Sequence, residues 1–291
     1  MSRWREIRKI DVHVHVVLHQ REDTDLTFNP PEAMLRTMDA HNVERAVVLP
    51  INHPEYFPLE GEEHADWLRA NNERQAGIVR DSDGRLSAFA DCAIDGKYVL
   101  PSRGVAELRR AVSQLGLEGL KIHASNLKTG VDDPRFLPWI EAAAGLGVPV
   151  VFHSSPTGYD PDFHGSAPSR IYRAVYGRDL AYVIAHMGGV SFFEAFAGGG
   201  YVDLSGTLLM VGQFFGAEGT ARLLRAIGID RLLFATDHPV YPYEAYYEIL
   251  DRLELSDEEI EKIAYANAER MLAGRPPAEP SEESTSGSPI G

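Results

Sequence analysis

Eight short hydrophobic segments alternate along the chain with longer segments of helical periodicity. The short segments are residues 7–15, 43–50, 86–94, 119–123, 148–153, 181–186, 201–205 and 231–237. Most of them are apolar at both odd and even positions, which is typical of strands covered on both faces, so we expect a parallel sheet. Between them, apolar residues recur every three or four positions, as Val105, Leu108, Val112 and Leu115 do, and this spacing predicts helices.

Eight strand–helix pairs in succession, joined by right-handed crossovers, either close into a barrel or open into a doubly wound sheet. The number of pairs favours an α/β fold of the (β/α)8 TIM-barrel type. An open sheet often has a glycine-rich phosphate turn after its first strand, whereas the first strand here ends at His15. Residues 198–200, three glycines before a strand, are expected to stop a helix. Ser256 and Glu259 have the spacing of a capping box and predict an extra C-terminal helix that ends near Leu272.

Composition and charge narrow the class of protein. We expect residues 1–275 to form one barrel domain and residues 276–291, rich in Pro, Ser and Glu, to form a flexible tail. The chain has 28 Lys and Arg against 43 Asp and Glu, a net charge of −15, which argues against nucleic acid or an anionic membrane as a partner. A single cysteine and the absence of an apolar leader predict a cytoplasmic protein, and a homo-oligomer is allowed.

Polar residues stand where hydrophobic strands end, which is the feature of the sequence that needs a chemical explanation. They are His13 and His15 in the first strand segment, Lys121 and His123 in the fourth, His153 in the fifth, His186 in the sixth and Asp237 in the eighth. A buried imidazole or carboxylate is costly unless it is paired or bound to a metal. In a (β/α)8 barrel the carboxyl ends of all strands meet at one rim, where the active sites of such enzymes lie.

The two-residue spacing of His13 and His15 points both imidazoles to the same face of a strand. His153 and Asp237 would reach the same rim, which gives three nitrogens and one oxygen suited to a divalent ion such as Zn²⁺, Fe²⁺ or Mn²⁺. Asp11 shares the parity of the two histidines, so we expect its carboxylate to hydrogen-bond one of their rings. The segments 52–57 and 241–243, which follow the second and eighth strands, are expected to contribute to specificity. Their Tyr and Phe side chains are candidates for stacking on a cyclic substrate, or else cover the barrel mouth.

The ordered set of motifs resembles the amidohydrolase superfamily, and more narrowly its amidohydrolase-related branch of metal-dependent hydrolases, lactonases and non-oxidative decarboxylases. The segments that carry the resemblance are IDVHVH (10–15), VFH (151–153), IAHMGG (184–189), LFATDHP (233–239) and IAYANAERML (263–272), and it covers residues 7–273. It implies that His13, His15, His153 and Asp237 bind one divalent metal, with zinc as first choice and manganese or iron as alternatives. It also implies that His186 contacts substrate or activates water.

Lys121 leaves two alternatives open. It resembles the position at which binuclear members carry a carboxylated lysine between two metals, in which case His153 and His186 would bind the second ion. An uncarboxylated Lys121, followed by His123, would instead serve as a cationic contact for a substrate carboxylate or phosphate. We favour one metal over two.

Metal-activated water would attack a small cyclic, amide or ester substrate, with Asp237 accepting the proton and His186 acting as a second catalytic group. We therefore expect a metal-dependent hydrolase of a small molecule. The first alternative is a non-oxidative decarboxylase of an aromatic or muconate-type acid, because the same ligands serve that reaction. The second alternative is a barrel that binds a ligand without catalysis.

Overall fold

The computed structural model describes residues 2–18, 27–51, 62–93, 101–155, 162 and 164–278. Its strands are β1 Lys9–Val14, β2 Val43–Val48, β3 Leu86–Ala88, β4 Leu120–Ile122, β5 Val150–Phe152, β6 Tyr182–Ile184, β7 Tyr201–Asp203 and β8 Leu232–Leu233. Each strand lies inside one of the eight expected segments, and all paired neighbours run parallel. The strands are shorter than predicted because the polar end of each segment continues into the loop that follows.

The strands close into a barrel. Two hydrogen-bonded sets, β1 to β3 and β4 to β8, are joined by isolated parallel bridges between Ala90 and Leu120 and between Val14 and His238. At the second junction the backbone N–H of His15 donates to the carbonyl oxygen of His238 over 2.7 Å. The predicted (β/α)8 barrel is therefore confirmed, and its first and last strands meet beside the residues that carry the metal-ligand motifs.

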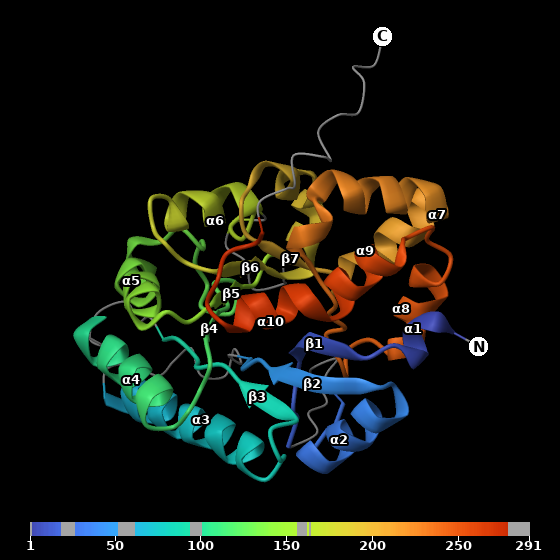
Figure 1. Ribbon diagram of the computed structural model, residues 1–291. Helices are drawn as coiled ribbons and strands as arrows, with labels where there is room; N and C mark the ends of the chain where they lie inside the picture. Colours follow the sequence, from blue (N-terminus) through green and yellow to red (C-terminus); the bar gives the residue numbers. More distant parts are fainter. Residues whose placement is uncertain are drawn as a thin grey trace.

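Helices form a ring around the strands (Figure 1). They are α1 Arg3–Glu6, α2 Pro31–Ala40, α3 Glu62–Arg80, α4 Pro101–Ser113, α5 Leu137–Leu146, α6 Pro168–Val175, α7 Thr207–Ile227, α8 Tyr243–Leu250, α9 Asp257–Glu261 and α10 Asn267–Leu272, with the 3₁₀ segments η2 Pro134–Phe136, η3 Ala185–Ala197 and η4 Ile229–Arg231 and the π-helical turn η5 Lys262–Ala266. As predicted, η3 stops at the glycine run that begins at Gly198. None of the described helices is long and apolar enough to cross a bilayer.

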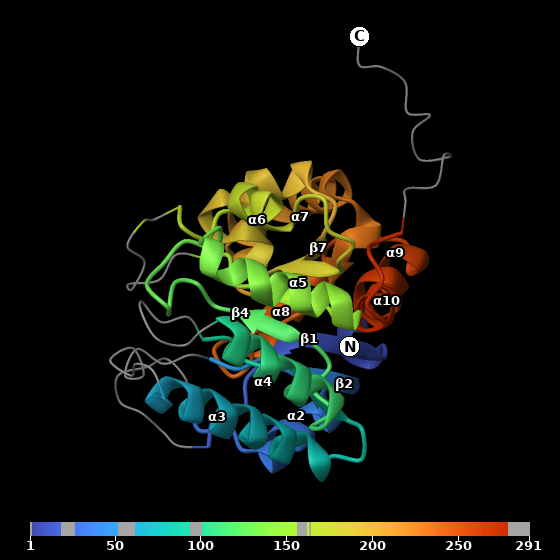
Figure 2. The same cartoon turned by 90° about the vertical axis from the view of Figure 1, so that its left-hand side faces the viewer.

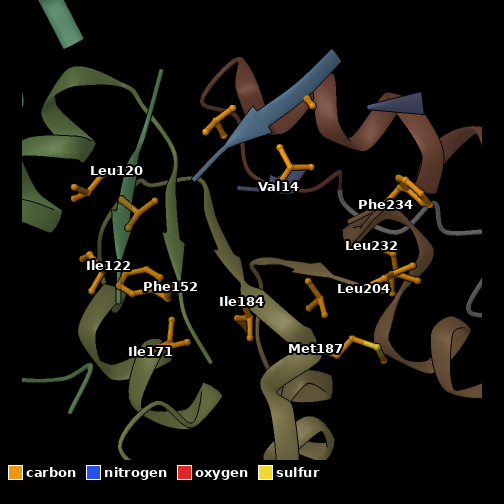
Figure 3. Close-up of a cluster of buried hydrophobic side chains, with 14 of the residues drawn as sticks. Val14, Leu120, Ile122, Phe152, Ile171, Ile184, Met187, Leu204, Leu232 and Phe234 are labelled. Atoms are coloured by element: carbon orange, nitrogen blue, oxygen red, sulfur yellow. The ribbon is translucent and has the colours of Figure 1, made fainter. Parts of the chain in front are cut away.

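Two hydrophobic layers hold the barrel. The outer layer lies between strands and helices and includes Leu120, Ile122, Phe152, Ile184 and Leu232 (Figure 3). The inner layer fills the barrel with side chains of opposite parity: Ile10, Val12, Val47, Leu49, Phe89, Val151, Val183, Leu233 and Ala235. Burial of apolar side chains on both faces of each strand explains why the strand segments are apolar at nearly every position.

The C-terminal helices cover one end of the barrel, as Figure 2 shows for α9 and α10. The predicted capping box begins α9, with the Ser256 side chain and Glu259 each bonding the other's backbone N–H. The Tyr265 hydroxyl donates to Glu44 near the amino end of β2 (2.9 Å), and the Tyr201 hydroxyl at the amino end of β7 donates to the carbonyl oxygen of Arg275 (2.9 Å). The helices thus cover the amino ends of the strands, which leaves the opposite rim for a functional site.

Candidate metal centre

His13 and His15 reach the carboxyl rim through an irregularity in β1. The register of β1 against β2 shifts between Asp11 and Val14, so Val12 belongs to the inner layer whereas Val14 packs in the outer one. The expectation that Asp11 bonds a histidine ring is wrong for this reason. Its carboxylate points the other way and accepts hydrogen bonds from the Tyr243 hydroxyl (2.7 Å), from Thr236 and from the backbone N–H of His13 (3.1 Å).

Asp237 follows β8 and is placed by a left-handed backbone conformation with φ of 60°. Its N–H donates to the carbonyl oxygen of His13 (2.8 Å), which ties the two loops together. The carboxylate oxygen Oδ1 then lies 2.9 Å from Nε2 of His15 and 3.5 Å from Nε2 of His13. A strained conformation of a residue other than glycine is typical of a functional site, because the surrounding structure must stabilise it.

The hydrogen-bond partners of the two rings determine which nitrogen carries the proton. Nδ1 of His15 faces the carbonyl oxygen of Leu49 (2.8 Å), and Nδ1 of His13 faces a carboxylate oxygen of Asp203 (2.9 Å). Both partners can only accept, so each Nδ1 donates and each Nε2 presents a lone pair.

Two lone pairs and a carboxylate oxygen therefore converge, with ligand atoms within 4.8 Å of one another. Acceptors at these distances repel unless a cation lies between them, either a shared proton or a metal ion. Imidazoles whose far nitrogen is already bonded to a carboxylate or carbonyl are the usual arrangement around protein-bound metals. His13, His15 and Asp237 thus fit a divalent ion on the chemistry of their donor atoms.

Burial favours the protonation states that a metal needs. Burial, with a smaller contribution from the charge of Lys121, lowers the pKa of His13 to about 4, so this imidazole is neutral at pH 7. Burial alone would raise the pKa of Asp237, but the neighbouring rings of His15, His13 and His186 hold the pKa well below its usual range. A neutral imidazole and an ionised carboxylate are the forms that bind Zn²⁺ or Mn²⁺.

His186 lies beside this group on a turn of unusual backbone. The four residues His186, Met187, Gly188 and Gly189 all have positive φ, between 52° and 87°. The centroid of the His186 ring is 4.9 Å from that of His13 and 4.8 Å from that of His153. The structure therefore brings the predicted catalytic histidine to the same rim as the predicted ligands.

His153 lies in this cluster but faces a different partner. Its Nε2 donates to the carbonyl oxygen of Ser155 (2.6 Å), and its Nδ1 lies 3.2 Å from Nε2 of His186. It does not join the group formed by His13, His15 and Asp237. Binding of the same ion by His153 therefore requires its ring to turn away from Ser155, and its role as a ligand stays a prediction.

Lys121 lies in β4, and His123 is the first residue after that strand. Lys121 is 1% exposed, and its Nζ has no hydrogen-bond partner among the described residues. Burial lowers the pKa of Lys121 to about 8, against the opposing effect of Asp203 and Asp237. The His123 ring stacks on His153 at 3.7 Å between centroids, and its Nδ1 accepts from the backbone N–H of Asn126.

Sequence reasoning missed Asp203 and Ser205, which follow one another closely at the end of β7. Both are fully buried, and both contact rings of the cluster. The signal that identified the other residues was present here as well, since the hydrophobic segment 201–205 ends in polar side chains. What the sequence could not show is that this carboxylate meets a histidine 190 residues away.

A cavity of about 270 Å³ opens beside the cluster. It is lined by His153, Ser155, His186, Gly189, Val190, Gly206, Thr207, Met210, Asp237 and Tyr241. The lining thus combines imidazoles and a carboxylate with the apolar side chains of Val190 and Met210 and the ring of Tyr241. Tyr241 lines the cavity as the sequence suggested, whereas Tyr243 is buried against Asp11 and cannot stack on a ligand. The other predicted specificity segment, residues 52–57, lies outside the described residues.

Comparison with known proteins agrees with the barrel fold. Solved structures of similar fold include 2,6-dihydroxybenzoate decarboxylase from Rhizobium, with 18% identity, a TM-score of 0.70 and coverage of 91% of this chain and 98% of that one. A dihydroxybenzoic acid decarboxylase from Polaromonas, with bound manganese and the inhibitor 2-nitroresorcinol, has 18% identity, a TM-score of 0.64 and coverage of 91% and 96%. A probable 2-pyrone-4,6-dicarboxylic acid hydrolase from Acinetobacter baumannii has 14% identity, a TM-score of 0.64 and coverage of 91% and 99%.

These identities show a shared fold and no more, and no curated protein gives a significant match. A family model described as amidohydrolase, however, matches residues 10–273, which is nearly the whole described chain. The chain therefore belongs to the amidohydrolase family, whose members are metal-dependent enzymes that include hydrolases and decarboxylases.

Proposed function

We propose that this protein is a metal-dependent decarboxylase of a small aromatic or similarly unsaturated carboxylic acid. The observation that carries the proposal is the convergence of three acceptor atoms, from His13, His15 and Asp237, beside a cavity that His186 also lines. The names of two structures of similar fold support the choice of reaction, since both are decarboxylases of dihydroxybenzoic acids.

The bound metal would be a single divalent ion, held by His13, His15 and Asp237 and joined by His153 when its ring turns. Such an ion supplies a positive charge that orients a carboxylate and its neighbouring oxygen, and it increases the acidity of bound water. None of the described residues that line the cavity is a lysine or arginine. The metal would supply a positive charge for a substrate carboxylate that enters from this side. Zinc, manganese and iron all suit these donor types.

The protein side chains then perform the proton transfer. In decarboxylation the bond between the ring carbon and the carboxyl carbon breaks, carbon dioxide leaves, and the electron pair stays on the ring carbon, which takes up one proton. His186 is the group placed to deliver that proton, because its ring lines the cavity and a protonated imidazole is a general acid. Burial lowers the pKa of His186 below its ordinary value, and the charges of Asp237 and Asp203 oppose that shift. The apolar wall formed by Val190, Met210 and Tyr241 would hold the ring of the substrate and exclude water.

Hydrolysis is the second candidate, and one observation favours it. Asp237 is an ionised carboxylate with 13% of its side chain exposed at the cavity, so it could accept a proton from an attacking water molecule. A similar fold occurs in the probable 2-pyrone-4,6-dicarboxylic acid hydrolase. A lactone ring with carboxylate groups would use the same ligands and the same apolar wall.

Product analysis separates the two reactions. Manganese-loaded and zinc-loaded protein would be incubated with dihydroxybenzoates labelled with ¹³C in the carboxyl group and, separately, with 2-pyrone-4,6-dicarboxylate. Our proposal predicts labelled carbon dioxide from the first and no ring opening of the second. Ring opening without carbon dioxide release would favour the hydrolase, and turnover of neither would favour a barrel that binds without catalysis.

His186→Gln tests the role of the catalytic group. Glutamine keeps a polar side chain of similar length but cannot deliver a proton, so kcat should fall by about 10²–10⁴-fold. Metal content, measured by elemental analysis on the same sample, should stay the same. Full turnover of the variant would remove His186 from the mechanism.

A further inference from the structure

Asp203 occupies the centre of the hydrogen-bond network behind the candidate metal centre. Its carboxylate is fully buried at the end of β7 and accepts four hydrogen bonds. Oδ2 accepts from Nδ1 of His13 (2.9 Å). Oδ1 accepts from the backbone N–H of His186 (2.8 Å), from the backbone N–H of Ser205 (3.0 Å) and from the Ser205 hydroxyl (2.5 Å).

This pattern fixes the orientation of two rings that have different tasks. Because Asp203 can only accept, His13 must carry its proton on Nδ1 and present the Nε2 lone pair toward Asp237. The Ser205 hydroxyl donates to Asp203, so its oxygen accepts a hydrogen bond from Nδ1–H of His186, 2.8 Å away. Nε2 of His186 is then the nitrogen on the far side of the ring, 3.2 Å from Nδ1 of His153, which also lines the cavity.

We propose that Asp203 is a shared positioning residue, which orients His13 for metal binding and, through Ser205, orients His186 for contact with substrate. This inference rests on the proposed function, in which His13 is a ligand and His186 is catalytic. It adds that metal affinity and proton delivery depend on one buried carboxylate that contacts neither metal nor substrate. Mutation of groups of this kind behind metal ligands typically lowers metal affinity or activity by about 10–100-fold.

Asp203→Asn is a sharp perturbation because the amide has nearly the same shape as the carboxylate. All four contacts are made with donors, and an amide has only one acceptor oxygen. If the NH₂ group faces His13, the ring must move its proton to Nε2 and lose its lone pair for the metal. If the NH₂ group faces the other side, it meets the N–H groups of His186 and Ser205.

Ser205→Ala removes the 2.8 Å connection to His186, together with one donor to Asp203 and a longer contact of 3.4 Å to Nδ1 of His13. The carboxylate keeps its contact with His13 and its two backbone donors, so the metal ligand stays oriented. The matched control is Asp11→Asn. Asp11 is another fully buried carboxylate, and it also accepts four hydrogen bonds, one of them from the backbone N–H of His13. Among the described residues Asp11 hydrogen-bonds no histidine ring, so this control reports the general cost of replacing a buried carboxyl group near the site.

The experiment combines Mn²⁺ affinity by chelator competition, separate kcat and KM values, and ¹⁵N NMR of the histidine rings in metal-free protein. Asp203→Asn should weaken Mn²⁺ binding by about 10–100-fold and shift the His13 ring away from the Nδ1–H tautomer. Ser205→Ala should keep the affinity and the KM of the unmodified protein but lower kcat. Asp11→Asn should keep the Mn²⁺ affinity and the His13 tautomer, although the protein becomes less stable.

Two results would overturn the inference: an affinity loss in Asp11→Asn as large as that in Asp203→Asn, or a His13 ring that carries its proton on Nε2 in the unmodified metal-free protein. A loss of metal affinity in Ser205→Ala equal to that in Asp203→Asn would contradict the separate tasks of the two residues. The NMR measurement needs no metal and no substrate. If the proposed function is wrong, the protein should fail to bind the metal. The NMR tautomer of His13 would still show whether Asp203 orients that ring.

Discussion

Tyr243→Phe removes one hydroxyl from the contact that holds β1 and β8 together. That hydroxyl donates to the buried carboxylate of Asp11 over 2.7 Å, and the same carboxylate binds Thr236 and the backbone N–H of His13. Phenylalanine fills the same space, so the change removes a hydrogen bond without leaving a large cavity. The contact is therefore expected to stabilise the two loops that carry His13 and Asp237.

The size of the effect should depend on pH. Burial raises the pKa of Asp11 to about 7 from an ordinary value of 3.8, and the four donors limit the rise. An acid whose pKa is higher in the folded state contributes stability at low pH, and this contribution is lost as the pH rises through 7. A hydrogen bond to an ionised group is worth about 1.5–3 kcal/mol, and one to a neutral group about 0.5–1.5 kcal/mol. Tyr243→Phe should therefore lower the free energy of unfolding more at pH 8.5 than at pH 5, with a difference of about 1–1.5 kcal/mol. This difference corresponds to a change of about one unit in the pKa of Asp11.

Urea unfolding of metal-free protein at both pH values measures the free energy of unfolding directly. The matched control is Tyr247→Phe in the same helix, because the Tyr247 hydroxyl is buried without a hydrogen-bond partner among the described residues. Its loss should change stability little at either pH. Equal losses for Tyr243→Phe at pH 5 and pH 8.5, or an equal loss in the control, would refute the reasoning about Asp11.

Three further predictions concern the metal, Lys121 and the turn at Gly189. Removal of metal with a chelator should lower the Tm, and Mn²⁺ or Zn²⁺ at 100 times its Kd should restore about 2.7 kcal/mol of stability; an unchanged Tm would count against metal binding to the folded state. Mass spectrometry under non-denaturing conditions should find one metal and an unmodified Lys121, whereas an added carboxyl group with two metals would establish the binuclear alternative. Gly189→Ala should destabilise by about 2–4 kcal/mol, because its new Cβ would lie 2.7 Å from the Ser154 carbonyl oxygen in a positive-φ conformation. Gly199→Ala, whose Cβ would meet nothing within 4 Å, is the control for urea unfolding, and an equal loss there would contradict the steric explanation.

The barrel could be predicted from the sequence because each strand segment is apolar on both faces and each is followed by a helical one. The same local information placed His13, His15, His186 and Asp237 at one rim, since a polar residue at the end of a buried strand needs a partner. The capping box was recognised for a similar reason, because its two residues, Ser256 and Glu259, are only three positions apart.

Features that depend on long-range contacts could not be predicted. The parity argument failed for Asp11 because the register shift in β1 reverses the side on which a residue lies, and no local pattern marks that shift. Tyr241 and Tyr243 are two residues apart, yet one lines the cavity and the other is buried against Asp11. Asp203 and Ser205 acquire their role only through contacts with His13 and His186, which come from other strands.

The most direct test of the central claim is anomalous diffraction from crystals soaked in Mn²⁺ or Zn²⁺. The account predicts one peak per chain, about 2.0–2.2 Å from Nε2 of His13, Nε2 of His15 and a carboxylate oxygen of Asp237, as such ligands require. If the protein binds one metal in solution but the anomalous peak lies away from these three residues, the account is contradicted.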